Sequence, residues 1–390
     1  MKRILVLVVL LVLVSGCAQV PKRHPLPRNL VHSARIPGIP KARQWGDQSP
    51  RYADKWFATP VAKLKEHFPA VYGQPHDYLA ISGGGPNGAF GAGLLVGWTE
   101  AGDRPNFTIV TGVSTGALMA PFVFLGPSYD GQLEEMYTTH STKDIIKKRG
   151  LLNTITSDAA ADSTPLQALL AHYVDDRMLK NIADEHRKGR RLFIGTTNLD
   201  SKRSVIWDIG AIATSGDPNA LNLIRQVLLA SASIPIAFPP VLVNVEADQQ
   251  YYDELHVDGG AASQVFLYPM NIDWDKVLHK LGVPGKPDVY VIRNSVMDPK
   301  YKATKNKIVP IAVSSMNSLI RSQGIGDLYQ IYLATLRDGL DYHLAYIPDS
   351  FEETPTEQFD PVYMRKLFDL GKRMGRSGYP WDNAPPGYKK

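Results

Sequence analysis

The feature that most constrains the fold is a strand that runs into a glycine-flanked serine and then directly into a helix. An apolar, β-branched stretch at 106–113 leads into the G-x-S-x-G motif of Gly112, Ser114 and Gly116, and a helical stretch at 115–125 follows. A turn this tight requires small residues on both sides of the serine. The hydroxyl is therefore expected at the carboxyl end of a strand, beside a helix N-terminus whose dipole favours negative charge.

The alternation of strands and helices continues through much of the chain. Short apolar stretches predict further strands, and helical periodicity predicts helices between them; the strands are expected at 78–81, 192–197, 204–209, 251–257 and 289–293, and the helices at 89–100 and 221–232. This order predicts an α/β fold with a mostly parallel sheet and helices on both faces. The pattern then becomes helical over 308–340 and 364–374.

A run of glycines follows the first of these strands. Gly83, Gly84 and Gly85 can present several backbone N–H groups in one concavity, which suits an oxygen that becomes negative during attack on a carbonyl. With Gly88 the run also fits the G-x-G-x-x-G pattern of dinucleotide folds. That alternative requires an acidic residue at the end of the second strand, where Ser114 stands instead. No Lys-Ser or Lys-Thr follows the glycines, so a P-loop is not expected either.

Asp258 is the candidate base for the serine. It closes an apolar strand and precedes Gly259 and Gly260, although an aspartate in that position can also be a turn or cap residue. His256 lies two residues earlier, on the same side of the strand. It is interpreted either as an accessory residue of a modified triad with Ser114 or as a partly buried histidine without a catalytic role.

Together these segments resemble the signature blocks of patatin-like phospholipases, in the same order along the chain. The blocks are 82–88, 112–116 and Asp258-Gly259, and a further stretch from Ala230 to Pro235 resembles the Ala-Ser-x-x-x-Pro segment of the family. The resemblance covers roughly residues 77–270. It implies a three-layer α/β/α fold and a Ser-Asp dyad without histidine, in which Ser114 is the nucleophile and Asp258 its base.

The same resemblance implies roles for the glycines and a class of substrate. The N–H groups of Gly83, Gly84 and Gly85 are expected to form the oxyanion hole, and the remaining glycines support the motifs: Gly88, Gly112, Gly116, Gly259 and Gly260. Family members hydrolyse phospholipids, lysophospholipids or neutral acyl esters, and they use no metal or organic cofactor. The alternative is a catalytically silent protein of the same fold that serves as an envelope scaffold or interaction module.

Three positions depart from the family pattern. Asn87 stands where relatives usually carry Arg or Lys, and Ser82 stands where they often carry Asp. The missing cation puts in doubt any role of position 87 in holding a phosphate headgroup. Ala117 replaces a second glycine after the elbow, and it is small enough that little consequence is expected.

The N-terminus has the pattern of an export signal. A basic start is followed by an apolar run at 4–14, which is too short to span a bilayer, and then by Val14-Ser15-Gly16-Cys17. This end resembles the lipobox of bacterial lipoproteins, in which Cys17 is lipidated and residues 1–16 are removed. Cys17 is also the only cysteine of the chain, so the mature domain is expected to lack disulfides and thiolate metal sites. Ala18 favours the outer membrane of the bacterial envelope by the same analogy.

These patterns divide the chain into four parts. Residues 1–16 are the signal, 17–76 a lipidated and proline-rich basic tether, 77–300 the acyl-hydrolase domain, and 301–390 a helical extension packed on that domain. The net charge of +5 is modest and its cations are scattered, which indicates a solvated surface and no nucleic-acid partner. The expected partners are a lipid or acyl-ester substrate and the membrane that holds the anchor; the sequence predicts no particular protein partner.

Overall fold

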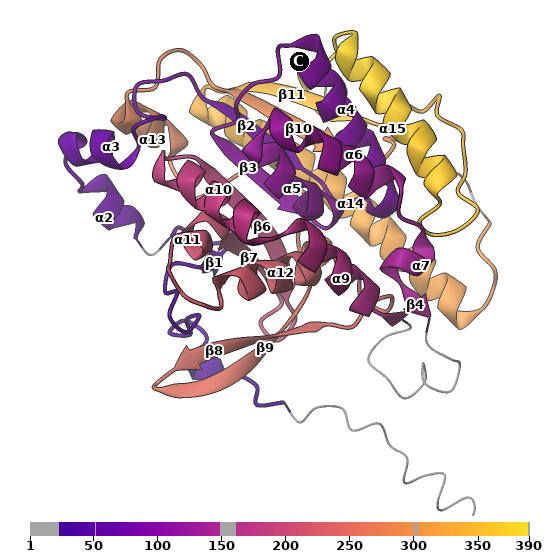
Figure 1. The fold of residues 1–390 in the computed structure, drawn as a ribbon, viewed down its shortest axis with the longest axis horizontal. Coiled ribbons are helices and arrows are strands. Elements are labelled where there is room, and N and C mark those ends of the chain that lie inside the picture. Colours follow the sequence, from indigo (N-terminus) through magenta and orange to yellow (C-terminus); the bar gives the residue numbers. More distant parts are fainter. Residues whose placement is uncertain (1–22, 51, 149–160, 299–300, 302, 389–390) are drawn as a thin grey trace, which may run out of the picture.

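A central β-sheet with helices on both faces organises the part of the chain that the computed structural model describes, residues 23–50, 52–148, 161–298, 301 and 303–388 (Figure 1). The strands lie in the order β1-β7-β6-β3-β2-β10-β11, and β9 pairs with both β6 and β8. Their bounds are Arg43–Trp45 (β1), Asp77–Ile81 (β2), Ile109–Val113 (β3), Arg191–Asn198 (β6), Arg203–Asp208 (β7), Val241–Ala247 (β8), Gln250–Asp258 (β9), Asp288–Arg293 (β10) and Asp341–Tyr346 (β11). Two short strands pair separately, Lys147–Lys148 (β4) and Ala161–Asp162 (β5).

The sheet is parallel in one part and antiparallel in the other. Strands β6, β3, β2, β10 and β11 run parallel to one another, whereas β1, β7, β8 and β9 join through antiparallel pairings. Parallel strands need crossover connections, and helices supply them here. The predicted α/β class is confirmed, and the antiparallel end is a difference that arises because β6–β7 and β8–β9 are joined by short turns.

Helices cover both faces of this sheet and shorter helical turns connect them. The helices are Ala53–Phe57 (α2), Val61–His67 (α3), Gly88–Ala101 (α4), Thr115–Leu125 (α5), Asp130–Thr138 (α6), Thr142–Ile145 (α7), Thr164–Tyr173 (α9), Asp176–Arg187 (α10), Ile209–Ala213 (α11), Ala220–Ser231 (α12), Trp274–Leu281 (α13), Ile308–Asp338 (α14) and Pro361–Arg376 (α15). The 3-10 turns are Arg28–Leu30 (η1), Gly85–Asn87 (η2), Pro127–Tyr129 (η3) and Gly259–Ala261 (η4).

The core is divided by the sheet into two apolar clusters. Successive side chains of a strand point to opposite faces, so Leu79 and Ile81 of β2 belong to one cluster and Tyr78 and Ala80 to the other. The first cluster lies under α4, α5, α10, α12 and α15, and the second lies under α13 and α14. Burial on both faces explains why β2 and β3 are apolar apart from Asp77 and Thr111.

Glycines allow α15 to lie almost directly on the backbone of α4. A Cβ added at Gly93 would lie 2.0 Å from the carbonyl oxygen of Phe368, and one at Gly97 would lie 2.1 Å from that of Lys372. The contact is reciprocal, because a Cβ at Gly371 would lie 2.3 Å from the carbonyl oxygen of Phe90. The helix that follows the glycine loop is therefore held by the C-terminal segment of the chain.

The C-terminal segment also contributes a strand that helical periodicity does not predict. β11 pairs in parallel with β10, with Leu344 opposite Val291, and it forms the end of the sheet. α14 is the crossover between these two strands. Residues 301–388 thus complete the central sheet in addition to adding helices to it.

Residues 23–76 do not form the flexible tether that their proline content predicts. β1 pairs with β7 in the central sheet, and Arg35 pairs with Glu246 of β8 through backbone hydrogen bonds of 3.0 and 2.9 Å. Ile36, Ile39 and Trp45 are buried in the core. Prolines are compatible with this arrangement because they are tolerated at sheet edges and in turns.

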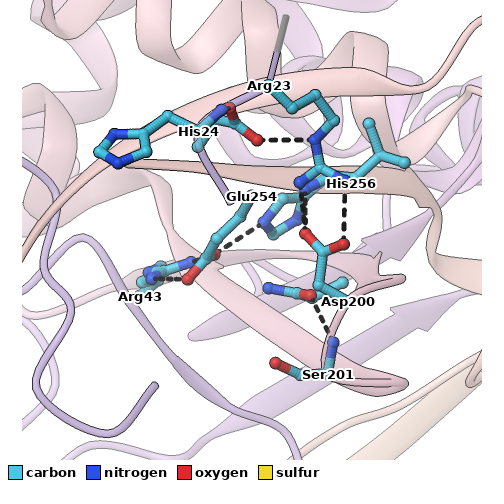
Figure 2. Close-up of polar contacts among 10 residues, drawn as sticks. Arg23, His24, Arg43, Asp200, Ser201, Glu254 and His256 are labelled. Atoms are coloured by element: carbon cyan, nitrogen blue, oxygen red, sulfur yellow. Dashed lines mark hydrogen bonds and ion pairs between the residues drawn. The ribbon is translucent and has the colours of Figure 1, made fainter. Parts of the chain in front are cut away.

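Ion pairs fasten this N-terminal segment to the turn between β6 and β7 and to β9 (Figure 2). Arg43 forms a two-point ion pair with Glu254, with 2.9 Å between Nη2 and Oε1, and both side chains are buried. Arg23 bridges Asp200, at 2.6 Å, and Asp253, at 2.7 Å. Burial alone would raise the pKa of Glu254, but the bonds from Arg43 and His256 outweigh it and hold that pKa at about 2.

The predicted signal peptide and Cys17 lie outside the described residues. Among the helices that are described, none has the length and apolarity needed to cross a membrane.

The Arg43–Glu254 pair gives a prediction for stability. Arg43→Ala leaves the Glu254 carboxylate buried without a counter-charge, so the free energy of unfolding should fall by about 3–5 kcal/mol in denaturant titrations. The matched control is Arg187→Ala, because Arg187 pairs with Asp184 on the surface. That variant should lose less than about 1 kcal/mol. Equal losses in the two variants would show that the N-terminal segment is not held by this pair.

Candidate active site

Ser114 stands in a strained turn between β3 and α5. Its backbone has φ of 55° and ψ of −124°, a left-handed conformation that costs a non-glycine residue on the order of 1–3 kcal/mol. The surrounding bonds hold it there: the Ser114 N–H donates to Oγ of Ser231 at 3.0 Å, and its carbonyl accepts from Leu118 N–H at 3.1 Å. This is the geometry of a nucleophile elbow, as the G-x-S-x-G motif predicts.

The glycines on either side of Ser114 are required by close backbone contacts. A Cβ at Gly112 would lie 2.4 Å from the carbonyl oxygen of Gly116, and one at Gly116 would lie 2.3 Å from that of Ile81. A Cβ at Gly88 would lie 2.2 Å from Oγ1 of Thr115. Any larger residue at these three positions would push the elbow away from β2 and from the glycine loop.

Strand pairing brings Asp258 next to Ser114. β9 pairs with β6, placing Asp258 opposite Thr196, and β6 pairs with β3, which ends one residue before Ser114. Gly259 permits this approach, because a Cβ there would lie 2.5 Å from the carbonyl oxygen of Gly195. The predicted nucleophile and base therefore meet, although they are far apart in the sequence.

The Asp258 carboxyl group is buried in a hydrogen-bonded position. Asp258 and Ser114 are 5% and 6% exposed. Burial raises the pKa of Asp258 to about 6, and hydrogen bonds from the Ser114 hydroxyl and from Gly260 N–H, the latter at 2.7 Å, offset part of the rise. A carboxylate with this pKa is a stronger base than an exposed aspartate, and it stays ionised at neutral pH.

Ser231 positions the elbow, a role that the sequence does not reveal. Its hydroxyl accepts from Ser114 N–H and donates to the carbonyl oxygen of Gly195 at 2.7 Å. It thereby connects the strained residue to β6, the strand that pairs with both β3 and the Asp258 end of β9. Ser231 lies in the Ala230–Pro235 stretch. The resemblance of this stretch to the family segment was the only sequence signal for its role.

The glycine loop offers two N–H groups at this site instead of three. The Gly83 N–H donates to the carbonyl oxygen of Gln264 at 3.1 Å, so the prediction of Gly83 as an oxyanion donor is corrected. Within the described part of the chain, the N–H groups of Gly84 and Gly85 have no acceptor, and Gly85 has a φ of 57° that favours glycine. Thr115 follows the nucleophile at the first position of α5, where a helix leaves N–H groups unpaired.

Gln264 joins the two halves of the site and was missed by sequence reasoning. Its backbone carbonyl accepts from Gly83, and its side-chain amide donates to the carbonyl oxygen of Gly260 at 2.9 Å. A Cβ at Gly83 would lie 3.0 Å from Oε1 of Gln264 and 3.2 Å from Cβ of Ser114, so all three crowd together. Nothing in the local sequence around residue 264 marks this role.

His256 does not join the dyad. Its Nε2 is 3.2 Å from Oε2 of Glu254 (Figure 2). Its Nδ1 is 2.9 Å from Oγ1 of Thr196, so both ring nitrogens have partners other than Ser114. Burial lowers the pKa of His256, although the bond to Glu254 opposes this. The interpretation as a buried histidine without a catalytic role fits this geometry, and the modified triad does not.

Asn87 is fixed by the C-terminal segment. The Tyr363 hydroxyl of α15 donates to Oδ1 of Asn87 at 2.7 Å. In place of a cation that faces a phosphate group, this position carries an amide that connects the glycine loop to α15. Among the described residues, no group of three or more His, Cys, Asp and Glu side chains is arranged to hold a metal ion.

A large apolar cavity lies away from the dyad. Its volume is about 490 Å³, and its lining includes Ile109 and Arg191 at the amino ends of β3 and β6, along with α2 and α3. Ser114 and Asp258 are at the opposite, carboxyl edge and do not line it. Phe266 lines the cavity and also lies beside β6 near the dyad, because a Cβ added at Gly195 would lie 2.9 Å from its Cε1.

Comparisons with known proteins identify the family. The model of the family described as patatin-like phospholipase matches residues 79–270, which include the elbow, the glycine loop and Asp258. The crystal structure of VipD from Legionella pneumophila aligns with a TM-score of 0.37 and 13% identity, over 78% of this chain and 67% of that one. No curated protein sequence matches the chain significantly. The chain therefore contains a patatin-like phospholipase domain at 79–270.

The raised pKa of Asp258 predicts how stability depends on pH. The folded pKa of about 6 exceeds the ordinary value of 3.8, so this carboxyl group favours folding below about pH 4 and loses that contribution as pH rises through 6. Asp258→Asn keeps the side chain neutral. It should raise the free energy of unfolding by up to about 3 kcal/mol near about pH 8 and change it little near about pH 4.

Denaturant titrations at both pH values measure this difference, with the exposed Asp349→Asn as a matched control. A stability gain of Asp258→Asn that is equal at both pH values, or a loss at about pH 8, would show that the ionised carboxylate does not strain the fold.

Proposed function

We propose that this protein is a serine acyl hydrolase that cleaves carboxylic ester bonds of lipids through Ser114 and Asp258. The patatin-like phospholipase domain supports lipid acyl hydrolysis in general. The observation that carries the dyad is the Ser114 hydroxyl, held in a strained elbow and hydrogen-bonded to a carboxyl group whose pKa is raised to about 6. The proposal covers three types of enzyme, a lipase, a phospholipase A and a lysophospholipase, and it names no acyl position.

In the first step Asp258 accepts the proton of Ser114 as Oγ attacks the ester carbonyl. Desolvation makes the carboxylate a better proton acceptor, and the pre-existing hydrogen bond sets the direction of transfer. The new bond between Oγ and the carbonyl carbon gives a tetrahedral intermediate with a negative oxygen. Collapse of the intermediate expels the alcohol of the lipid, which takes the proton from Asp258, and leaves an acyl-enzyme.

The negative oxygen is stabilised by backbone N–H groups that have no acceptor among the described residues. Gly84, Gly85 and the start of α5 at Thr115 supply these donors, so no rearrangement of the loop is needed during the reaction. Removing one such donor typically costs on the order of 10²-fold in rate. Water then attacks the acyl-enzyme, Asp258 accepts its proton, and Ser114 takes that proton as the fatty acid leaves. No metal or organic cofactor takes part in this scheme.

Membrane attachment is the second element of the proposal. The apolar run at 4–14 and the sequence that ends at Cys17 support lipidation and an outer-membrane location in the bacterial envelope. Residue 23, the first described residue, is tied to Asp200 and Asp253 beside β9. A lipid anchor at Cys17 would therefore hold the domain within a few residues of the membrane, which raises the effective concentration of lipid substrate.

A fluorophosphonate probe tests the nucleophile. The wild-type chain should be labelled and should release fatty acid from phospholipid, and Ser114→Ala should abolish labelling and lower hydrolysis by on the order of 10³-fold or more. The matched control is Ser33→Ala. The exposed hydroxyl of Ser33 donates to the Leu30 carbonyl oxygen, so this variant should behave as wild type. All assays contain a strong chelator, because the mechanism needs no metal.

Two outcomes would contradict the proposal. Absence of labelling in both wild type and Ser114→Ala would favour the catalytically silent scaffold. An active Asp258→Asn protein together with an inactive, folded His256→Ala protein would replace Asp258 by His256 as the base.

A further inference from the structure

Helix α14 is much longer than the strands it connects. Its 31 residues span about 46 Å, whereas the 6 residues of β10 span about 20 Å. Because α14 connects parallel strands β10 and β11, it starts beyond the carboxyl edge of the sheet and runs back across it. Its first half must therefore extend past that edge, and Figure 1 shows α14 reaching beyond the sheet toward α7.

The two halves of α14 differ sharply in burial. In the second half, Leu328, Ile331 and Tyr332 are buried against the sheet. In the first half, Ile308 is 87% and Leu319 is 71% exposed, and Ile311 and Val313 are exposed as well. The sequence from Ile308 to Ile320 contains no charged residue. We call the exposed side chains Ile308, Ile311, Val313 and Leu319 the α14 overhang.

The overhang lies at the edge that carries the catalytic dyad. Ser114 follows the carboxyl end of β3, and Gln264 contacts the turn after Asp258. A Cβ at Gly324 of α14 would lie 3.4 Å from Cβ of Gln264, so the helix passes the site at Gly324. The overhang precedes Gly324 in the chain and so projects beyond the carboxyl edge of the sheet, past the turn that carries Asp258.

Cations precede the overhang directly. Lys305 and Lys307 are exposed, and in the described part of the chain neither forms an ion pair. Tyr301 is almost fully exposed as well. Exposed apolar patches of this kind mark interaction sites, and an apolar helix beside lysines and an aromatic residue suits the boundary between lipid headgroups and acyl chains.

We propose that the α14 overhang, with Lys305 and Lys307, is a docking surface for an anionic lipid bilayer. The apolar side chains enter the acyl boundary, the two lysines contact anionic headgroups, and the dyad faces the lipid surface. The inference deepens the proposed function. It rests on that function, because the purpose of docking is to bring the dyad to its lipid substrate. It does not depend on lipidation of Cys17, and it differs from a contact with a second copy of the chain because its charges are complementary to phosphate groups.

A fluorescent probe placed on the overhang tests the contact directly. Leu319→Cys is labelled with an environment-sensitive dye in the full-length chain, with Cys17→Ser in every variant so that only the new thiol reacts. Vesicles of phosphatidylethanolamine and phosphatidylglycerol should shift the emission to the blue, and spin-labelled acyl chains should quench it. The control is Asp103→Cys, exposed after α4 at the opposite edge of the sheet, whose dye should not respond.

Kinetics separate docking from chemistry. The Ile308→Glu, Leu319→Glu double variant should hydrolyse vesicle phospholipid at least about tenfold more slowly and a water-soluble short-chain ester at the wild-type rate. Lys305→Gln with Lys307→Gln should weaken binding to anionic vesicles by on the order of tenfold, and high salt should remove that difference.

Several results would overturn the docking surface. A Leu319→Cys dye that is unchanged by vesicles that sediment with the protein would do so. A dye that shifts with protein concentration alone would assign the overhang to a second copy. Failure of wild type to hydrolyse either ester would refute the proposed function instead, and the dye response would still decide the docking.

Discussion

The desolvated hydrogen bond between Ser114 and Asp258 is the interaction on which the site depends. Burial raises the pKa of the carboxyl group, and the serine hydroxyl partly compensates for the lost water. The fold supports this costly arrangement from both sides: Ser114 is fixed by Ser231, and Asp258 is fixed by Gly260 N–H. The packing of the sheet around the site offsets the free-energy cost of the strained elbow and of the buried charge. Active sites commonly retain unfavourable groups in this way.

The local parts of the site could be predicted from the sequence. An elbow needs glycines at fixed offsets from Ser114, and the turn after Asp258 needs them as well, so short-range sterics leave a readable pattern. The α/β class follows from the alternation of apolar strands with helices. What joins Ser114 to Asp258 is the pairing of β3 with β6 and of β6 with β9, which only the resemblance to a family supplied.

The long-range parts could not be predicted. Gly83 fails as an oxyanion donor because its N–H bonds to Gln264, a residue 181 positions later whose role no local pattern marks. β11 is missed because its partner β10 lies about fifty residues earlier and the intervening sequence is helical. The N-terminal prolines suggest a free tether, yet the buried pair of Arg43 with Glu254 attaches this segment to β9. In each case a contact with a residue far along the chain determines the structure that the local sequence adopts.

Direct titration of the Asp258 carboxyl group tests the central claim. Carbon-13 NMR of aspartate-labelled protein, with Asp258→Asn to assign the signal, reports the pKa of this one group. The account predicts an apparent pKa of about 6, which should rise further in Ser114→Ala because the hydroxyl that favours the ionised form is lost. A pKa near 3.8, or one that Ser114→Ala leaves unchanged, would contradict it.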